Sequence, residues 1–337
     1  MLFGASTPCA KLLLGRVEPQ WLAGLLYLGS GVGLGARALL RRAFGPGQLQ
    51  EAPLAKADLP WLGGAILAGG VIAPVLLMFG LRGTPASSAS LLLNLEGVFT
   101  AALAWFVFHE NFDRRIFAGM MAILAGGALL SWDAQLSGGV PWAALAIAGA
   151  CLGWALDNNL TRKVSAADPV QIAGLKGLIA GAVNVGIALA ISPSLPALPA
   201  VVAAGVLGLL SYGVSLVCFV LALRQLGTAR TGAYFSTAPF LGAALSLALV
   251  REAPTLGFWI AATLMAFGVW LHLTERHQHR HRHGPLEHGH RHVHDAHHRH
   301  EHGPNDPPGE PHSHWHRHEP LEHSHPHYPD LHHRHKH

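Results

Sequence analysis

Charge is scarce in this chain. Asp, Glu, Lys and Arg make up 12% of its 337 residues, whereas 50% belong to the hydrophobic set. A soluble domain of average composition has about twice that charged fraction. The net charge is only +4, and the sequence has neither a basic patch nor a nucleic-acid motif, so nucleic acid is not expected as a partner. The composition favours a protein embedded in a lipid bilayer.

Cysteine is also rare. The chain has Cys9, Cys151 and Cys218, all in apolar stretches and none in a CxxC motif. This spacing argues against a disulfide framework and a thiolate metal site, and we expect three small buried side chains. A nucleophile elbow, a Walker loop and a helical HExxH motif are missing too. The sequence therefore predicts no enzyme and no required cofactor.

Long apolar runs are abundant instead. A membrane helix needs about 20 mostly apolar residues, and the qualifying segments are 19–40, 59–81, 85–108, 114–132, 141–158, 169–191, 199–222, 229–250 and 254–273. Segment 1–14 is apolar but short, and it lacks the basic start of a signal peptide. We interpret it as a further helix whose beginning lies upstream of Met1, with a re-entrant segment as the alternative.

The two halves of this apolar body resemble each other. Residues 18–31 (EPQWLAGLLYLGSG) align with 168–181 (DPVQIAGLKGLIAG), and 79–82 (FGLR) align with 221–224 (LALR). Five helices per copy is an odd number, so the second copy enters the membrane from the opposite side. Inverted repeats are typical of transporters, whose substrate site lies near the midplane between the copies. The predicted fold is an all-α membrane protein with ten transmembrane helices in two inverted five-helix repeats, the first helix being short or truncated.

Basic residues in the loops predict the orientation, because cytoplasmic loops are enriched in Lys and Arg. With a cytoplasmic amino terminus, the inner loops carry Arg37, Arg41, Arg42, Lys56, Arg114, Arg115, Arg162, Lys163, Arg224 and Arg230. The outer loops carry only Arg16, Arg82 and Arg251, with Lys11 at a helix end. We therefore predict a multi-pass protein of the cytoplasmic membrane whose carboxyl terminus is cytoplasmic.

Three stretches carry a family resemblance. SASLLLNLEGVFTAALAWFVFHENF (88–112), followed by FAGMMAILAGGALL (117–130), resembles the first repeat of the EamA-like drug/metabolite transporters. GAYFSTAPFLGAALSLALVREAPT (232–255) resembles the second repeat. The resemblance covers 1–273 and implies ten helices, two inverted repeats and secondary transport, mostly export of small metabolites. The expected domains are a first repeat over 1–132, a second over 141–273 and a tail over 275–337.

Two features depart from the family pattern. Glu96 precedes Gly97 where the family often has a Glu-Pro pair, and the proline is kept only in the second copy, as Pro239. The first helix is also short. Pro239 and Pro74 are both expected to kink their helices, because proline removes a backbone donor.

Polar residues within the spans are candidates for the substrate path, because a charge at membrane depth needs a cavity or a partner. Glu96 lies near the middle of its span and is expected to take part in substrate or proton coupling, since burial favours the protonated form of a carboxylate. The alternative is a helix contact in which Glu96 pairs with a basic group. Asn94 lies about 200° around the helix from Glu96, so the two need not share a face.

The stretch WALDNNLTRK (154–163) is the most polar part of the body. Asp157, Asn158 and Asn159 are consecutive and point around the helix, so at least one should face the interior. The alternative places all three at the cytoplasmic end of the span.

Two lysines complete the candidate path. Lys176 either extends towards the membrane interface or pairs with a carboxylate of the body, Asp157 or Glu96. Lys11 lies in the first segment, and its alternative role is to anchor a helix end.

Histidine is concentrated in the tail: 23 of the 25 histidines follow residue 274, many at alternate positions. Many Pro, Gly and charged residues and no apolar periodicity predict that this tail is disordered. Neutral imidazole binds nickel, cobalt, zinc and copper, so we expect weakly selective binding that is lost below about pH 6.5. The candidate ligands are His277, His279, His281, His283, His288, His290, His292, His294, His297, His298, His300, His302, His312, His314, His316 and His318. A solubilising tail without a metal role is the alternative.

Three functions remain open. The first is a secondary transporter that exports a small-molecule substrate and carries a metal-binding tail. The second is a nickel, cobalt or zinc exporter whose tail captures the ion. The spans argue against it, because His109 lies at a helix end, His272 lies at the junction with the tail, and no paired-carboxylate site is visible. The third is a membrane-anchored metal store or sensor, for which two repeats of spans are far more than an anchor needs. A homodimer is a further candidate assembly.

Overall fold

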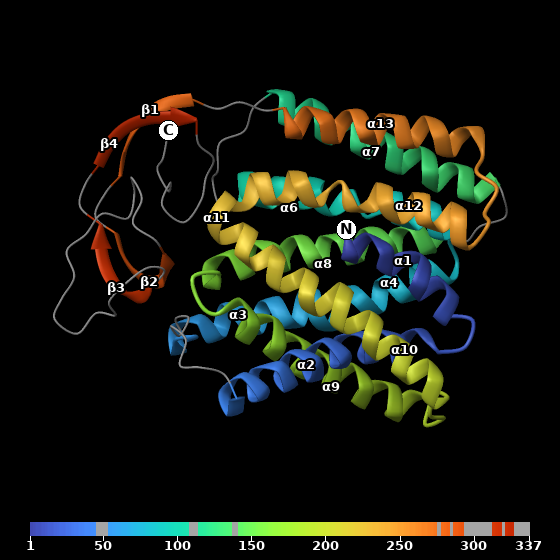
Figure 1. Ribbon diagram of the computed structural model, residues 1–337. Coiled ribbons are helices and arrows are strands. Elements are labelled where there is room, and N and C mark those ends of the chain that lie inside the picture. The colour runs from blue at the N-terminus through green and yellow to red at the C-terminus, as the bar shows by residue number, and fades with distance from the viewer. Residues whose placement is uncertain are drawn as a thin grey trace.

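The computed structural model describes residues 1–44, 53–107, 114–136, 141–274, 278–283, 286–292, 312–318 and 321–326. Up to residue 274 the described secondary structure is helical (Figure 1). The α-helices are α1 (Leu2–Leu13), α2 (Pro19–Phe44), α3 (Leu59–Ala65), α4 (Ala73–Arg82), α5 (Ala86–Leu92), α6 (Leu95–Phe106), α7 (Arg114–Leu136), α8 (Pro141–Val164), α9 (Pro169–Ile191), α10 (Leu198–Gly208), α11 (Ser215–Phe235), α12 (Ala238–Leu249) and α13 (Leu256–Leu273). A 3-10 turn, η1 (Lys56–Asp58), precedes α3, and the π-helical turns η2 (Ile66–Ile72) and η3 (Leu209–Val214) join α3 to α4 and α10 to α11.

Seven helical segments of the described chain are long and apolar enough to cross a membrane. They are Pro19–Leu40, Lys56–Arg82, Ala86–Leu103, Arg114–Trp132, Pro169–Ile191, Leu198–Arg224 and Leu256–Leu273. The shorter apolar helix Ala238–Leu249 and the 24-residue helix α8 lie among them.

One expectation was wrong: residues 223–228 were predicted to link two spans, but α11 continues through them. Gly227 is the lone helix-weakening residue of that link, and without a proline it does not end the helix.

Prolines and capping residues explain several helix starts. Pro19, Pro141 and Pro169 open α2, α8 and α9, where a missing backbone N–H costs no hydrogen bond. Asp168 caps α9, because its carboxylate accepts from the backbone N–H groups of Val170 (2.8 Å) and Gln171 (3.4 Å).

The two prolines expected to kink helices both lie at interruptions. Pro74 lies at the start of α4, directly after the π-helical turn η2. Pro239 lies at the start of α12, directly after the break between α11 and α12 at 236–237. Each proline therefore lies beside a break in the regular α-helix, and a kink at either one stays a prediction.

Corresponding helices of the two halves are antiparallel neighbours. α2 packs on α9, and a Cβ atom placed on Gly24 would meet Val185, whereas one on Gly31 would meet Leu178. Contacts thus move backwards along α9 as they advance along α2. The same holds for α7 and α13, the pair at the top of Figure 1, where Ile116 contacts His272 and Gly126 contacts Met265. Glycines let these backbones approach closely.

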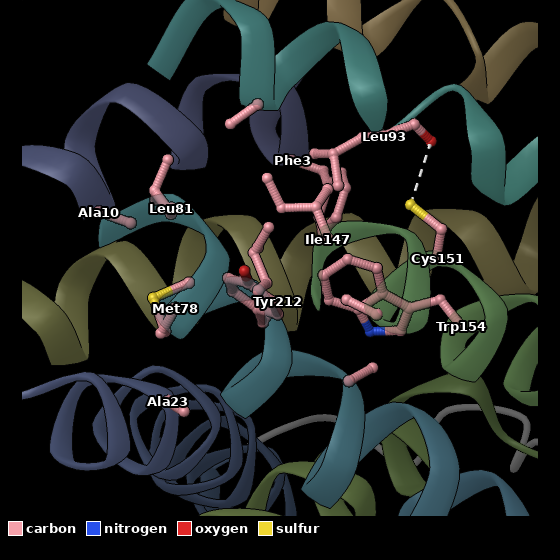
Figure 2. Packing of buried hydrophobic residues seen from close by; sticks show 14 of the residues in the cluster. Phe3, Ala10, Ala23, Met78, Leu81, Leu93, Ile147, Cys151, Trp154 and Tyr212 are labelled. Carbon is pink, nitrogen blue, oxygen red and sulfur yellow. Dashed lines mark hydrogen bonds between the residues drawn. The ribbon is translucent and has the colours of Figure 1, made fainter. Parts of the chain in front are cut away.

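The interior is apolar and aromatic, and so is the outside of the bundle. Phe3 packs edge-on against Trp154 and Tyr212, with ring centroids 5.6 and 5.7 Å apart (Figure 2). On the outside, Leu145 and Leu256 are 72% and 76% exposed, and many other large apolar side chains are exposed as well. Such a surface is typical of a protein in contact with lipid.

The prediction that the cysteines are buried holds only for Cys151. Cys9 is half-buried and Cys218 is exposed, and all three are free thiols. Cys218 lies within an apolar span and faces outwards, because apolar side chains of a membrane helix can point to lipid as well as to the core. Apolar sequence context therefore does not separate the two environments.

Part of the tail forms strands. β1 (Gln278–His283) pairs antiparallel with β4 (Leu321–Pro326), and β2 (Leu286–His292) pairs antiparallel with β3 (His312–His318). The disordered tail stays a prediction, and the structure describes these four short strands within it. Their residues alternate between histidine and other types, which suits the two-residue period of a strand.

Candidate functional site

Two helix interruptions meet in the interior. In the first half, α5 ends and α6 begins around Leu93 and Asn94; in the second half, α11 and α12 are separated at Ser236 and Thr237. A Cβ atom on Gly97 would lie 3.0 Å from the Ser236 hydroxyl, so the two interruptions are neighbours. The sequence predicted polar residues here but not this pairing of broken helices.

A small pocket lies between these interruptions and is open to solvent at its mouth. Helices of both halves contribute to it. Its polar lining is Glu96, Thr100, Asn158 and Ser236; its apolar lining is Phe3, Leu93, Phe219, Phe235 and Pro239; and Gly97 and Gly232 complete the wall.

Glu96 is the charged residue of this described lining. Its side chain is buried at 7% exposure, and Asn158 Nδ2 donates to its Oε1 atom (2.7 Å). Among the described residues its partner is a neutral amide and not the basic group considered as the alternative. Glu96 and Asn158 are thus the two predicted path residues that the pocket brings together.

Asp157 and Lys176 form a separate buried ion pair. Lys176 Nζ donates to both carboxylate oxygens of Asp157 (2.5 and 2.7 Å), and Thr161 Oγ1 donates to the same carboxylate (2.8 Å). Lys176 is only 1% exposed, so it does not extend to the membrane interface. Of the two carboxylates considered for it, Asp157 is the partner.

The remaining predicted residues lie outside the pocket lining. Asn159 Nδ2 donates to the carbonyls of Ala155 (2.9 Å) and Thr100 (3.4 Å). Asn94 Nδ2 donates to the Leu91 carbonyl (3.0 Å) at the end of α5. Asn94 thus satisfies a carbonyl at the end of α5, whereas Asn159 donates to carbonyls within α8 and α6.

Lys11 anchors a helix end. Its Nζ atom donates to the carbonyls of Leu81 (2.6 Å) and Thr84 (2.8 Å), where α4 leaves its last carbonyls without helical partners. These contacts agree with the alternative role considered for Lys11.

Sequence reasoning missed the polar contacts of the π-helical turn η2. The Gly69 carbonyl accepts hydrogen bonds from Tyr27 (2.7 Å) and from Trp154 Nε1 (2.9 Å). Asn184 Nδ2 donates to the next carbonyl, that of Gly70 (3.2 Å), and Gln20 Nε2 donates to Asn184 (3.1 Å). Two features of the sequence could have indicated these contacts. Gly69 and Gly70 are adjacent glycines in one apolar span, and Gln20, Tyr27, Trp154 and Asn184 are hydrogen-bonding side chains in other apolar spans.

The three phenylalanines of the pocket were missed as well. Phe3 and Phe219 both pack against Phe235, with ring centroids 5.1 and 5.0 Å apart. Cys151 of α8 contacts the α5–α6 interruption, where its Sγ atom lies 3.9 Å from the Leu93 carbonyl (Figure 2). A phenylalanine in an apolar span has no sequence feature that separates a pocket from a helix contact.

The histidine candidates of the tail divide into two sets. Those on the four strands pair across the sheets, for example His288 with His316 and His281 with His323. His277, His294, His297, His298, His300 and His302 lie outside the described residues, as does His109. No group of three or more His, Cys, Asp or Glu side chains gathers as a metal site in the part of the chain that the structure describes.

Comparisons with known proteins agree with this architecture. The family model of the EamA-like transporter family matches residues 1–132 and again 141–274. An uncharacterized transporter of Methanothermobacter thermautotrophicus (strain Delta H) is 28% identical in an alignment of 284 residues that covers 80% of this chain and 82% of that protein. A solved crystal structure shares the fold, with a TM-score of 0.60 at 21% identity over 81% of this chain and 94% of the other. With two matched repeats spanning nearly all of its helical body, this chain is a membrane transporter and belongs to the EamA-like transporter family.

Proposed function

We propose that this protein is a secondary transporter of the cytoplasmic membrane that exports a small metabolite through the pocket containing Glu96. One observation supports this above all: the pocket at the meeting point of two interrupted helices is lined by both repeats and holds a buried carboxylate. Motion of one repeat against the other would change which side of the membrane reaches such a pocket.

The proposal includes ten membrane-spanning helices in inverted repeats. α1 and α8 supply the first span of each repeat, and α12 completes the ninth. The antiparallel pairing of α2 with α9 and of α7 with α13 supports inversion, since corresponding helices of parallel repeats would run in the same direction.

The orientation is proposed from the basic residues. Arg224 donates to carbonyls beyond the end of α8 (2.7 and 2.9 Å), Lys163 lies 5.8 Å from the Trp61 ring at the start of α3, and Arg115 donates to Thr274 at the end of α13 (3.2 Å). All of these helix ends lie on the left in Figure 1, the side from which the tail leaves. This side would be cytoplasmic.

Metal export is the second candidate function, favoured by the histidine tail alone. Its weakness is the pocket, whose described lining offers one carboxylate and no imidazole or thiolate. Transition-metal transport paths need several such ligands. We therefore assign any metal binding to the tail and not to the path.

A tolerance and efflux screen tests the proposal. Cells expressing the full chain are challenged with amines, amino acids, nickel, cobalt and zinc, in parallel with Glu96→Gln and a chain lacking 275–337. Tolerance to at least one organic compound should rise, fall with Glu96→Gln at equal protein level, and persist without the tail. Tolerance that is limited to metals and lost with the tail would instead establish metal export, and no gain for any compound would contradict transport of this kind.

A further inference from the structure

We infer that the substrate is a small organic cation with an apolar body, such as an alkyl- or arylammonium ion, and that Glu96 is its counter-ion. This inference rests on the proposed function and specifies what the pocket accepts. It is carried by the charge of the described lining, by the aromatic wall and by a hydroxyl without a partner.

The carboxylate of Glu96 lacks compensation within the described lining. Its hydrogen bond from Asn158 is neutral, and the nearby buried ammonium of Lys176 already binds both oxygens of Asp157. A buried carboxylate without a counter-charge is unfavourable, so it takes up either a proton or a cation. An ammonium substrate and a proton would therefore compete for Glu96.

The wall beside this carboxylate is aromatic. Phe3, Phe219 and Phe235 line the pocket and pack on one another, and the face of a phenyl ring attracts a cation. The same rings would bury the apolar body of the substrate. A carboxylate and several phenyl rings in one pocket are the combination that an organic ammonium ion needs.

A hydroxyl of the lining is free to bind a ligand. Thr100 Oγ1 is buried and has no hydrogen-bond partner among the described residues. Thr100 lies one helical turn after Glu96, so both side chains project to the same face of α6. The positive charge of an ammonium ion between them would face both the carboxylate and the hydroxyl oxygen.

Anions and zwitterions are disfavoured by the same lining. The carboxylate of an amino acid would enter beside Glu96, and the described lining offers no Lys, Arg or His to receive it. Two like charges in a buried site repel strongly. The pocket should therefore select an amine over the amino acid that carries the same side chain.

Three probes that share one phenyl group test this selection. The purified full chain in liposomes is assayed for exchange of benzyltrimethylammonium, phenylalanine and 3-phenylpropionate, with protein-free liposomes as the blank. The permanently charged cation should exchange about tenfold faster than the other two, and Glu96→Gln should lower its rate about tenfold or more. Glu18→Gln is the matched control, because Glu18 forms an exposed pair with Arg82 (3.3 Å) and does not line the pocket.

A second variant tests the wall independently of the charge. Phe235→Leu keeps an apolar side chain but removes a ring, and it should weaken cation binding about threefold or more, measured by protection against thermal unfolding. Exchange of phenylalanine but not of the cation would overturn the substrate class and leave the transporter proposal standing. Exchange of none of the probes would count against both.

Discussion

At the scale of single residues, the buried ion pair separates what sequence can and cannot predict. Polar residues in an apolar span identified Asp157 and Lys176 as candidates, yet two carboxylates competed for the lysine. The register between α8 and α9 decides in favour of Asp157. That register depends on side-chain packing between helices, which hydropathy does not describe. The phenylalanines of the pocket were missed for the same reason.

The pair gives a residue-scale prediction. Lys176→Met leaves a buried carboxylate without its counter-charge and should lower the free energy of unfolding by about 3–5 kcal/mol. The double variant Asp157→Asn with Lys176→Met removes both charges and should recover most of this loss, because replacement of a whole buried pair is often nearly neutral. Thermal unfolding of the purified protein in detergent, followed by tryptophan fluorescence, measures both. Equal losses in the single and double variants would contradict it.

At the scale of elements, most helices could be predicted and their irregularities could not. The predicted segment 169–191 coincides with α9, because a long apolar run between Pro169 and Ser192 has clear ends. The π-helical turns η2 and η3 and the interruptions beside the pocket went unpredicted. They shift a few backbone hydrogen bonds without changing hydropathy, and such turns often mark functional sites.

The α2–α9 contact gives an element-scale prediction. A Cβ atom on Gly31 or Gly177 would lie 2.3 or 2.4 Å from backbone of the opposite helix, so Gly31→Ala and Gly177→Ala should each destabilise the protein by about 1–3 kcal/mol. Gly35→Ala and Gly186→Ala are matched controls on the same two helices, because nothing lies within 4 Å of their Cβ positions. These controls should be neutral or slightly stabilising. Equal effects in both sets would show that the helices do not pack as described.

At the scale of the whole molecule, two repeats and the transporter family follow from the sequence, because internal similarity and apolar spans extend over the entire body.

The orientation in the membrane is a prediction: the carboxyl terminus should be cytoplasmic. Added protease should digest the tail in inverted vesicles and not in intact spheroplasts, read by loss of the 275–337 fragment. Digestion from the outside would reverse the orientation.

The tail gives a second prediction at this scale. The full chain should bind several nickel or zinc ions at pH 7.5 and lose them below about pH 6.5, because protonated imidazole is not a ligand. Equilibrium dialysis with metal analysis measures this binding. The chain without 275–337 should bind none of these ions and keep its unfolding temperature, and unchanged metal binding would move the ligands into the helical body.

The two repeats contribute different charges to the pocket, although the fold is duplicated. By the alignment of 79–82 with 221–224, Glu96 of the first repeat corresponds to Ala238 of the second, and the described lining holds one carboxylate. One carboxylate carries either one proton or one monovalent ammonium ion at a time. We therefore expect a one-for-one, electroneutral antiport, whose turnover follows the pH difference across the bilayer and does not change when a membrane voltage is imposed.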